Sequence, residues 1–449
     1  MYIQNYAELT SHGQVTDRKT LIDIIEYSLR AADPYVATQN LVRLKGNILN
    51  VGDLHFDLSK RGKIYLLGAG KATFPVAKAL EEILGEKLTD GIVIVKEGQQ
   101  GTLQRVNLIQ ASHPLPDKRG YLAAQKMKAM AEQAKEGDIV FCAITGGSSA
   151  LAPLPINGVN IEEKRKVHEV LLNSGATIRE INTVRKHLSQ IKGGRLALSV
   201  FPAELINLTV SDVIGDPLDY ITDPTVPDTS TFADAISVLQ HYGLFNKIPE
   251  SAQEYLLTAT QEKENPKDFA GKPLHTFIIV KSEIPCEAAI RRAKELGFNS
   301  ILLTTTLSGE SKEMAHIFAS IASEVKTYER PFKSPCLIVA GGETTVSLQG
   351  RHGLGGPNQE MALSAALQLE RMDGVVFAAI DTDGTDGLTS FAGGIVDSST
   401  AMRANQKGLD LMQSIFFHDT AIVLNELGDA IKTGHTGTNV NDLYLILID

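Results

Sequence analysis

Short apolar runs alternate with amphipathic segments along most of the chain. A run of consecutive apolar residues predicts a strand that is buried on both faces, as in a parallel sheet covered by helices. Apolar residues at spacings of three and four predict the helices between these strands. The first set of predicted strands lies at 63–67, 91–95, 106–110, 138–144 and 204–210, with helices at 73–84, 119–135 and 161–175.

A second set of the same kind begins after residue 233. Its predicted strands lie at 275–280, 300–303, 336–340, 375–380 and 443–448, with helices at 284–297, 311–327 and 359–371. This alternation predicts two α/β domains with mostly parallel or mixed sheets, one over 1–233 and one over 234–449. Ligands are expected where the carboxyl ends of the strands meet glycine-rich turns.

The charge balance restricts the partners. The 449 residues include 43 Lys and Arg against 53 Asp and Glu, a net charge of −10. This balance argues against nucleic acids and anionic membrane surfaces as partners. The N-terminal residues have no signal-peptide pattern, and the three cysteines form no CxxC pair, which predicts buried thiols in a reducing compartment. We expect a cytoplasmic monomer or homodimer that acts on small molecules.

Two glycine-rich turns follow predicted strands and are candidate anion sites. Gly68-Ala-Gly-Lys-Ala72 places Lys71 at the start of a helix, where backbone N–H groups and the helix dipole favour an anion. Thr145-Gly-Gly-Ser-Ser-Ala150 adds hydroxyl groups to the same arrangement. Neither turn has the spacing of a Walker A loop, a complete GxGxxG or a GxSxG elbow. Plain strand–helix turns, and a serine nucleophile in the second, are the alternatives. The candidate binding residues are Gly68, Gly70, Gly146, Gly147, Ser148 and Ser149.

A basic segment follows at 179–195. It contains five Lys or Arg residues and one Glu, a net charge of +4 in an acidic protein. Arg185 and Lys192 are candidates for neutralising phosphate charge. The glycines after Lys192 favour contact with a ligand, and a solvated basic helix is the alternative.

Two acidic turns also follow predicted strands, at 211–216 and 381–386. Carboxylates at strand ends suit Mg²⁺, which binds one or two carboxylates together with phosphate oxygens and water. Turns rich in Asp and Gly for conformational reasons are the alternative. A further glycine turn contains Glu343, and a polar helix start contains Asn358 and Glu360. The candidate carboxylates are Asp212, Asp216, Asp381, Asp383 and Asp386. Together, glycine turns, a basic segment and acidic turns fit phosphoryl transfer.

Nine motifs in order resemble the glycerate 2-kinases that have a C-terminal MOFRL domain, over a stretch from about residue 20 to the end. The motifs begin at Gly68, Thr145, Val184, Ser211, Pro224, Gly341, Asn358, Asp381 and Thr436. The resemblance implies ATP-dependent phosphorylation of D-glycerate at its 2-hydroxyl, giving 2-phosphoglycerate and ADP, with Mg²⁺ or a similar cation. It also implies a Rossmann-like domain over 1–233, a MOFRL region at about 335–445, and an active site in the cleft between the two domains.

The resemblance also implies roles for residues. Lys71 matches the family's active-site lysine, and Pro357 stands where family members usually have an arginine, so one substrate or phosphate contact is expected to differ. From position and charge, Arg185, Asp212 and Lys192 join Lys71 as the expected catalytic residues. Glu343, Asn358 and Glu360 join the two glycine turns as expected substrate or phosphate ligands. Asp216, Asp381, Asp383 and Asp386 are the expected metal ligands. The alternatives are an NAD(P)H-dependent hydroxypyruvate reductase and a kinase or binder of another small sugar acid.

Overall fold

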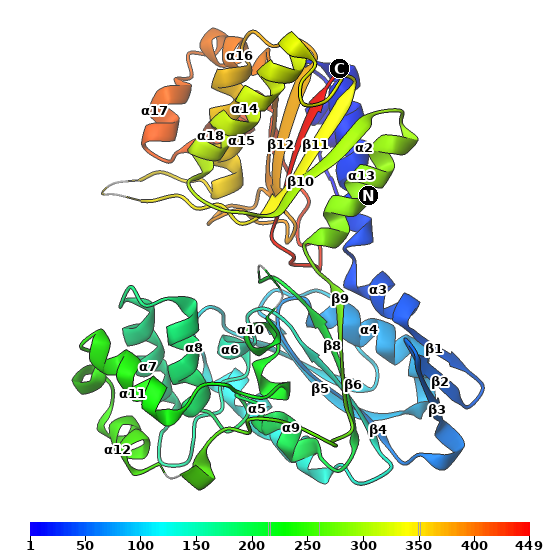
Figure 1. Ribbon diagram of the computed structural model, residues 1–449, viewed down its shortest axis with the longest axis vertical. Helices are drawn as coiled ribbons and strands as arrows, with labels where there is room; N and C mark the ends of the chain where they lie inside the picture. Colours follow the sequence, from blue (N-terminus) through cyan, green and yellow to red (C-terminus); the bar gives the residue numbers. More distant parts are fainter. Residues whose placement is uncertain (214, 216, 260, 349, 351) are drawn as a thin grey trace. The chain divides into compact units, whose positions relative to one another are not determined.

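The chain forms two compact α/β units, seen in a computed structural model that describes residues 1–213, 215, 217–259, 261–348, 350 and 352–449 (Figure 1). The central unit is Pro34–Ile279. The terminal unit combines Met1–Asp33 with Val280–Asp449. Each unit is built on a six-stranded sheet, which confirms the predicted fold class.

The central sheet has the strand order β6-β5-β4-β7-β8-β9. β4 is parallel to both β5 and β7, and the pairs β5–β6 and β7–β8 are also parallel. All residues of β4 and β7 are buried, as continuous apolar strands require. The strands are β4 (Ile64–Ala69), β5 (Leu88–Lys96), β6 (Val106–Ala111), β7 (Ile139–Ile144), β8 (Glu204–Val210) and β9 (Leu274–Val280).

Helices of the central unit cover this sheet and form a separate helical cluster. Met127 of α5 and Leu196 of α9 share a core with the sheet residue Val140. Val184 of α8 and Leu239 of α11 belong to a second core, made of helices. The helices are α3 (Pro34–Leu41), α4 (Thr73–Leu84), α5 (Lys118–Gln133), α6 (Ser148–Leu151), α7 (Ile161–Leu172), α8 (Ile178–His187), α9 (Arg195–Val200), α10 (Leu218–Ile221), α11 (Phe232–His241) and α12 (Glu250–Thr258).

A small antiparallel sheet in the central unit was not predicted from the sequence. It consists of β1 (Val42–Lys45), β2 (Ile48–Val51) and β3 (Leu54–Asp57). Strands of four residues are too short to show a clear alternation of apolar and polar positions.

The terminal sheet is mixed, with the strand order β10-β11-β15-β12-β13-β14. β10 and β11 are parallel, whereas β15 runs antiparallel between β11 and β12. The strands are β10 (Asn299–Leu307), β11 (Cys336–Gly342), β12 (Val375–Asp381), β13 (Gly393–Asp397), β14 (Ala430–Ile431) and β15 (Asp442–Ile448).

Helices cover both faces of the terminal sheet (Figure 1). Along β15, Tyr444 and Ile446 pack in the core that includes Phe318 of α14, whereas Leu443 and Leu445 pack in the core that includes Ile25 of α2. Apolar side chains on both faces explain the uninterrupted apolar run. The helices are α1 (Tyr6–Leu9), α2 (Val15–Ala31), α13 (Glu283–Glu295), α14 (Ser311–Tyr328), α15 (Pro357–Leu369), α16 (Thr400–Gln406), α17 (Leu411–Phe416) and α18 (Thr420–Leu427).

The division between the units differs from the predicted boundary at residue 233. The strand expected at 275–280 as part of the second domain is β9, which lies beside β8 at the edge of the central sheet. The N-terminal helix α2 packs against α13 on the terminal sheet, so residues 1–33 belong to the terminal unit. None of the helices in the described parts of the chain is long and apolar enough to cross a membrane.

A buried ion-pair network attaches α2 to the terminal unit. The Arg18 side chain is fully buried, with Nε 2.5 Å from Oδ2 of Asp397 and Nη1 2.8 Å from Oδ1 of Asp429. Arg403 also pairs with Asp429, at 2.6 Å. The two carboxylates have lowered pKa values because, although burial opposes it, Arg18 stabilises their charged forms. This network joins Arg18 to residues that are 379 and 411 positions away in the sequence.

Replacing Arg18 by Met should strongly destabilise the protein, because Asp397 and Asp429 would lose their shared buried cation. Breaking a buried ion pair from one side typically costs about 3–5 kcal/mol. The matched control is Lys19→Met, which removes the same charge from an exposed neighbour. Urea unfolding should show a large loss for Arg18→Met alone, and equal midpoints for the two variants would contradict this role.

Candidate active site

The two predicted glycine turns lie together at the carboxyl ends of β4 and β7. The backbone N–H of Lys71 donates to the carbonyl oxygen of Gly146 at 2.9 Å. The N–H of Ala72 donates to Oγ1 of Thr145 at 3.1 Å. Gly70 has φ of +143°, and a Cβ there would lie 2.0 Å from the same Oγ1. Glycine is therefore required for this close approach of the turns.

The second turn is surrounded by polar side chains. A Cβ on Gly146 would lie 1.9 Å from Oδ2 of Asp212, so the carboxylate contacts the turn backbone directly. A Cβ on Gly147 would lie 3.2 Å from the His113 ring and 3.3 Å from Cγ of Lys71. The structure thus brings Lys71 and Asp212 to one turn, together with His113. The hydroxyl-bearing residues Ser148 and Ser149 begin α6 beside this turn and are half-buried.

His113 is a site residue that the sequence did not indicate, because an isolated histidine is more often structural. Burial, together with the charges of Lys71 and Lys96, lowers its pKa to about 4. The imidazole is therefore neutral at neutral pH. Lys71, which was predicted to bind an anion, therefore also contributes to the lowered pKa of His113.

The basic segment is not a solvated helix, because its central cations are buried on α8 and in the turn that follows. Nζ of Lys192 lies 3.0 Å from both carboxylate oxygens of Asp223. Arg185 is 6% exposed, with Nη1 3.5 Å from Oδ1 of Asn182. Its Nε has no hydrogen-bond partner among the described residues. Burial lowers the pKa of Arg185 to about 10, which Asp223 partly opposes.

Two further basic residues on α7 lie beside this segment and were missed by sequence reasoning. Nζ of Lys164 donates to the backbone carbonyls of Arg185 and Leu188, at 3.2 and 2.9 Å. Burial, with the charges of Lys192 and Arg185, lowers the pKa of Lys164 to about 7. Burial and the same cations lower the pKa of His168 to about 2. Arg185 and Lys192 therefore add to the effect of burial on Lys164 and His168, as cations do when they are close together.

A carboxylate cluster lies at the ends of three strands in the terminal unit. The antiparallel register places Asp442 of β15 opposite Asp381 of β12 and Gly342 of β11, and Glu343 follows β11. Burial raises the pKa of Asp381 well above its usual value, with Asp383 and Asp442 adding to the effect. Burial also raises the pKa of Asp442 to about 7, assisted by Asp386 and Glu343. Asp442 was not singled out, although it ends the Thr436–Asp442 motif.

Asp386 holds the start of α15. Its Oδ1 accepts from the backbone N–H and the side-chain amide of Asn358, both at 3.1 Å. Its Oδ2 accepts from the backbone N–H and the side-chain amide of Gln359, both at 2.9 Å. The Asn358 amide also donates to Oδ1 of Asp442 at 2.8 Å. The first turn of α15 is therefore capped by a protein carboxylate, and Asn358 links that cap to the carboxylate cluster.

Glu360 points in a different direction from Asn358. It is 1% exposed, and its Oε2 lies 2.7 Å from Nδ1 of His418. Burial raises the pKa of Glu360, while His418 opposes the shift. Pro357, which stands where the resemblance expects an arginine, occupies the first position of α15. Proline is favoured there because its ring is compatible with the first helical turn.

The terminal carboxylates have the donor chemistry that Mg²⁺ prefers. The charges of Asp383 and Asp442 favour the protonated form of Asp381, so a divalent cation would relieve this repulsion. No group of three or more His, Cys, Asp or Glu within the described ranges is arranged to hold a metal ion alone. Magnesium ions in proteins commonly bind one or two carboxylates together with phosphate oxygens. Asp216, another predicted ligand, lies outside the described residues.

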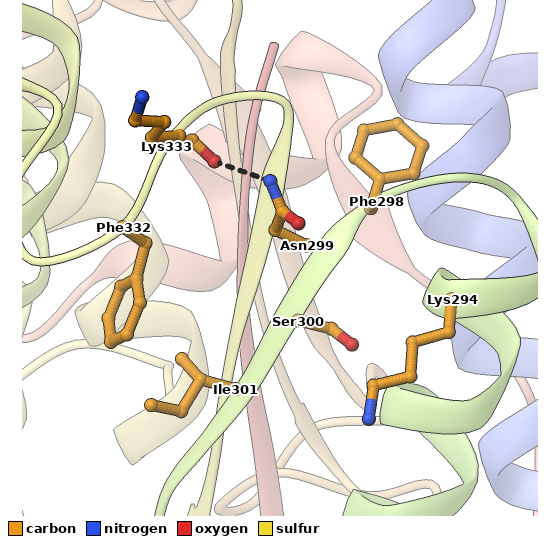
Figure 2. Close-up of a pocket in the computed structure, with 7 residues that line it drawn as sticks. All are labelled: Lys294, Phe298, Asn299, Ser300, Ile301, Phe332 and Lys333. Atoms are coloured by element: carbon orange, nitrogen blue, oxygen red, sulfur yellow. Dashed lines mark hydrogen bonds between the residues drawn. The ribbon is translucent and has the colours of Figure 1, made fainter.

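A separate pocket of about 500 Å³ lies near the first residues of β10 (Figure 2). Lys294 and Lys333 lie at opposite sides of it, and the side chain of Asn299 donates to the backbone carbonyl of Lys333 at 3.0 Å. None of the predicted site residues lines this pocket. It is at the opposite end of β10 and β11 from the carboxylate cluster, since those strands end at Leu307 and Gly342.

The two units form an α/β protein with buried cations in the central unit and buried carboxylates in the terminal unit. Two family models match the chain, the Domain of unknown function (DUF4147) at residues 20–257 and the MOFRL family at 336–442. A glycerate 2-kinase from Pyrococcus horikoshii is 40% identical over 96% of this chain and 97% of that protein. The chain belongs to this family, the MOFRL-containing glycerate 2-kinases.

Other relatives cover the chain to the same extent. A crystal structure of glycerate kinase from Thermotoga maritima matches with a TM-score of 0.85 and 40% identity, over 96% of this chain and 99% of that one. A protein from Agrobacterium vitis that is named as a hydroxypyruvate reductase is 36% identical over 97% of this chain and 95% of that protein. The resemblance that the ordered motifs indicated is confirmed.

Asp442 should make the protein less stable as the pH rises. Its folded-state pKa of about 7 lies above the ~3.9 of an unfolded Asp, so the native state binds more protons between these values. Stability is therefore lost as the pH rises from about 4 through 7. Asp442→Asn should reduce the loss between pH 5 and pH 8 by at least about 1 kcal/mol, the equivalent of roughly one pKa unit.

The matched control for this pH series is Glu370→Gln, which changes an exposed carboxylate at the end of α15. Urea unfolding at both pH values gives the comparison. If Asp442→Asn kept the same pH dependence as Glu370→Gln, the carboxylate cluster would not be the origin of the effect.

Proposed function

We propose that this chain transfers the γ-phosphoryl group of ATP to the 2-hydroxyl of D-glycerate, which makes it a glycerate 2-kinase. The observation that carries the proposal is the 40% identity to a glycerate 2-kinase over nearly the whole of both chains. The charged clusters of the two units support it, because both reactants are anions and one of them carries a divalent cation.

In this proposal the central unit binds the acid and the transferring group. Arg185 donates from its unpartnered Nε, because a buried guanidinium without an ion pair has the most to gain from an anion. Lys71 and the backbone N–H groups of Gly146–Ser149 stabilise charge at the carboxyl ends of β4 and β7. Asp212, in contact with the same turn, orients the substrate hydroxyl.

Lys192 has a different part in the proposal from the one expected of it. Its ammonium group is held by both oxygens of Asp223, so its charge is already matched. It fixes the Lys192-Gly-Gly turn beside Arg185. Lys164 acts in a similar way, since its contacts with the last carbonyls of α8 hold the backbone that carries Arg185.

The terminal unit binds the phosphates of ATP with their cation. Asp381, Asp383 and Glu343 are the proposed carboxylates of that site. Asp386 positions α15 instead of contacting the metal, because both of its oxygens accept hydrogen bonds from Asn358 and Gln359. When bound, Mg²⁺ would neutralise charge on the phosphate oxygens.

Phosphoryl transfer makes modest demands on base catalysis. Its transition state is largely dissociative, so positioning and electrostatic stabilisation account for most of the acceleration. Arg185, Lys71 and the turn N–H groups supply these effects with fixed donors. Asp212 needs only to accept a hydrogen bond from the hydroxyl and to take its proton late in the reaction.

A single assay series separates this function from its nearest alternative. Glycerate-dependent release of ADP is followed with coupling enzymes, and NADH oxidation with hydroxypyruvate is followed in parallel. The proposal predicts ADP release that requires glycerate, ATP and Mg²⁺. It predicts no NADH oxidation in the parallel assay with hydroxypyruvate. The reverse pattern would identify a reductase, and turnover with another sugar acid alone would redirect the substrate.

Arg185→Met should lower kcat/KM for glycerate about 100-fold or more, the typical effect of losing one charged donor at a site of developing charge. It should not lower the melting temperature, because the variant removes a buried cation that has no ion pair in the described chain. Arg179→Met on the same helix is the control, since Arg179 is exposed. Near-normal kinetics in Arg185→Met would remove this residue from the mechanism.

Lys71→Met should reduce kcat by orders of magnitude with little change in melting temperature, because Lys71 is half-buried in a surface turn. The control is Lys78→Met, which removes an exposed lysine from α4. Steady-state kinetics and thermal unfolding of both variants give the comparison. Equal activity of the two variants would exclude Lys71 from the transfer step.

A further inference from the structure

A cavity of about 200 Å³ lies beside the start of α15 in the terminal unit. Its walls are mostly apolar side chains and glycine backbone, including Val346, Leu354, Pro357 and Leu388. Leu388 is 89% exposed, which is unusual for a large apolar residue in a well-packed domain. Exposed apolar residues around a cavity are typical of ligand-binding grooves.

One polar atom of a residue that lines this cavity is unsatisfied. Glu360, which lines the cavity, is 1% exposed. His418 contacts only its Oε2, and Oε1 has no hydrogen-bond partner in the described parts of the chain. Buried oxygens are almost always paired with a donor. A buried acceptor in an apolar cavity therefore points to a ligand that supplies an N–H group.

We propose that this cavity binds the adenine base of the nucleotide, with Oε1 of Glu360 accepting a hydrogen bond from the exocyclic amino group. Apolar walls suit the faces of a planar base, and the single available oxygen suits one amino group. His418 acts as a positioning residue, because its contact with Oε2 fixes the orientation of the carboxylate. The inference rests on the proposed function only for the identity of the nucleotide.

The cavity is next to the carboxylate cluster in the same unit. Gly387 and Leu388 line it and directly follow Asp386, which is bonded to Asn358 and through it linked to Asp442. A base in the cavity would therefore leave its phosphates near the carboxylates proposed to hold their cation. The two features of the terminal unit then form one nucleotide site.

The test is equilibrium binding of nucleoside diphosphates by calorimetry in the presence of Mg²⁺. Wild-type protein should bind ADP at least about tenfold more tightly than IDP, which has a carbonyl oxygen in place of the amino group. Glu360→Met should bind ADP about tenfold more weakly and lose the preference over IDP. Pyrophosphate should bind both proteins equally, because it has no base.

The control is Glu370→Met, which removes an exposed carboxylate from the other end of α15 and should keep the preference for ADP. Equal binding of ADP and IDP by the wild-type protein, or no binding of ADP, would by itself overturn the proposal. A preference for GDP over ADP would overturn the assignment to adenine. An unchanged preference in Glu360→Met would exclude Glu360 as the contact.

These outcomes are separate from the fate of the kinase proposal. Glycerate-dependent ADP release without a preference for ADP over IDP would support the kinase function and contradict the proposed adenine site. A preference for ADP over IDP that is lost in Glu360→Met, without turnover of glycerate, would support the adenine site and contradict glycerate as the acceptor.

Discussion

Repulsion between buried like charges is the physical constraint on which the candidate sites depend. Arg185 and Lys164 are held together in the central unit, and Asp381 and Asp442 are held together in the terminal unit. Taking such groups out of water and placing them side by side costs free energy, which appears as shifted pKa values. The sheets and helices around them supply the stability that makes these arrangements possible. The same repulsion is relieved when a ligand of opposite charge binds.

This constraint also explains how an acidic protein can bind anions. The net charge of −10 describes the whole chain, whereas the central unit gathers cations at one place and matches only some of them with carboxylates. Lys192 is paired with Asp223, and Lys186 with Asp219 and Asp228. Arg185 has no such pair among the described residues, so its positive charge is not matched by a carboxylate in an ion pair. A negative net charge is therefore compatible with small anionic substrates.

Much of the fold could be predicted from the sequence, because buried strands and amphipathic helices leave periodic patterns. The limits of β7 and α4 were close to those predicted, and the two glycine turns lie together as strand order implies. Contacts between residues far apart in the sequence were harder to predict. Nothing local in β9 indicates that it joins the central sheet, and nothing local in α2 indicates that Arg18 meets Asp397 and Asp429.

The candidate site was predictable to the extent that residue type and position imply chemistry. Lys71 and Asp212 were expected at strand ends, and both meet the Gly146–Gly147 turn. Residues that act through neighbours were missed or given another role. Asp386 caps α15, a contact that depends on how a turn folds back on a helix. Lys164 was missed because its partners are backbone carbonyls, which sequence patterns do not reveal.

The central claim is that this chain phosphorylates glycerate at its 2-hydroxyl. The most direct measurement is ³¹P nuclear magnetic resonance of the products formed from D-glycerate, ATP and Mg²⁺, with authentic phosphoglycerates as standards. We expect the signals of ADP and 2-phosphoglycerate in equal amounts. A signal of 3-phosphoglycerate, or loss of ATP without any phosphoglycerate, would contradict it.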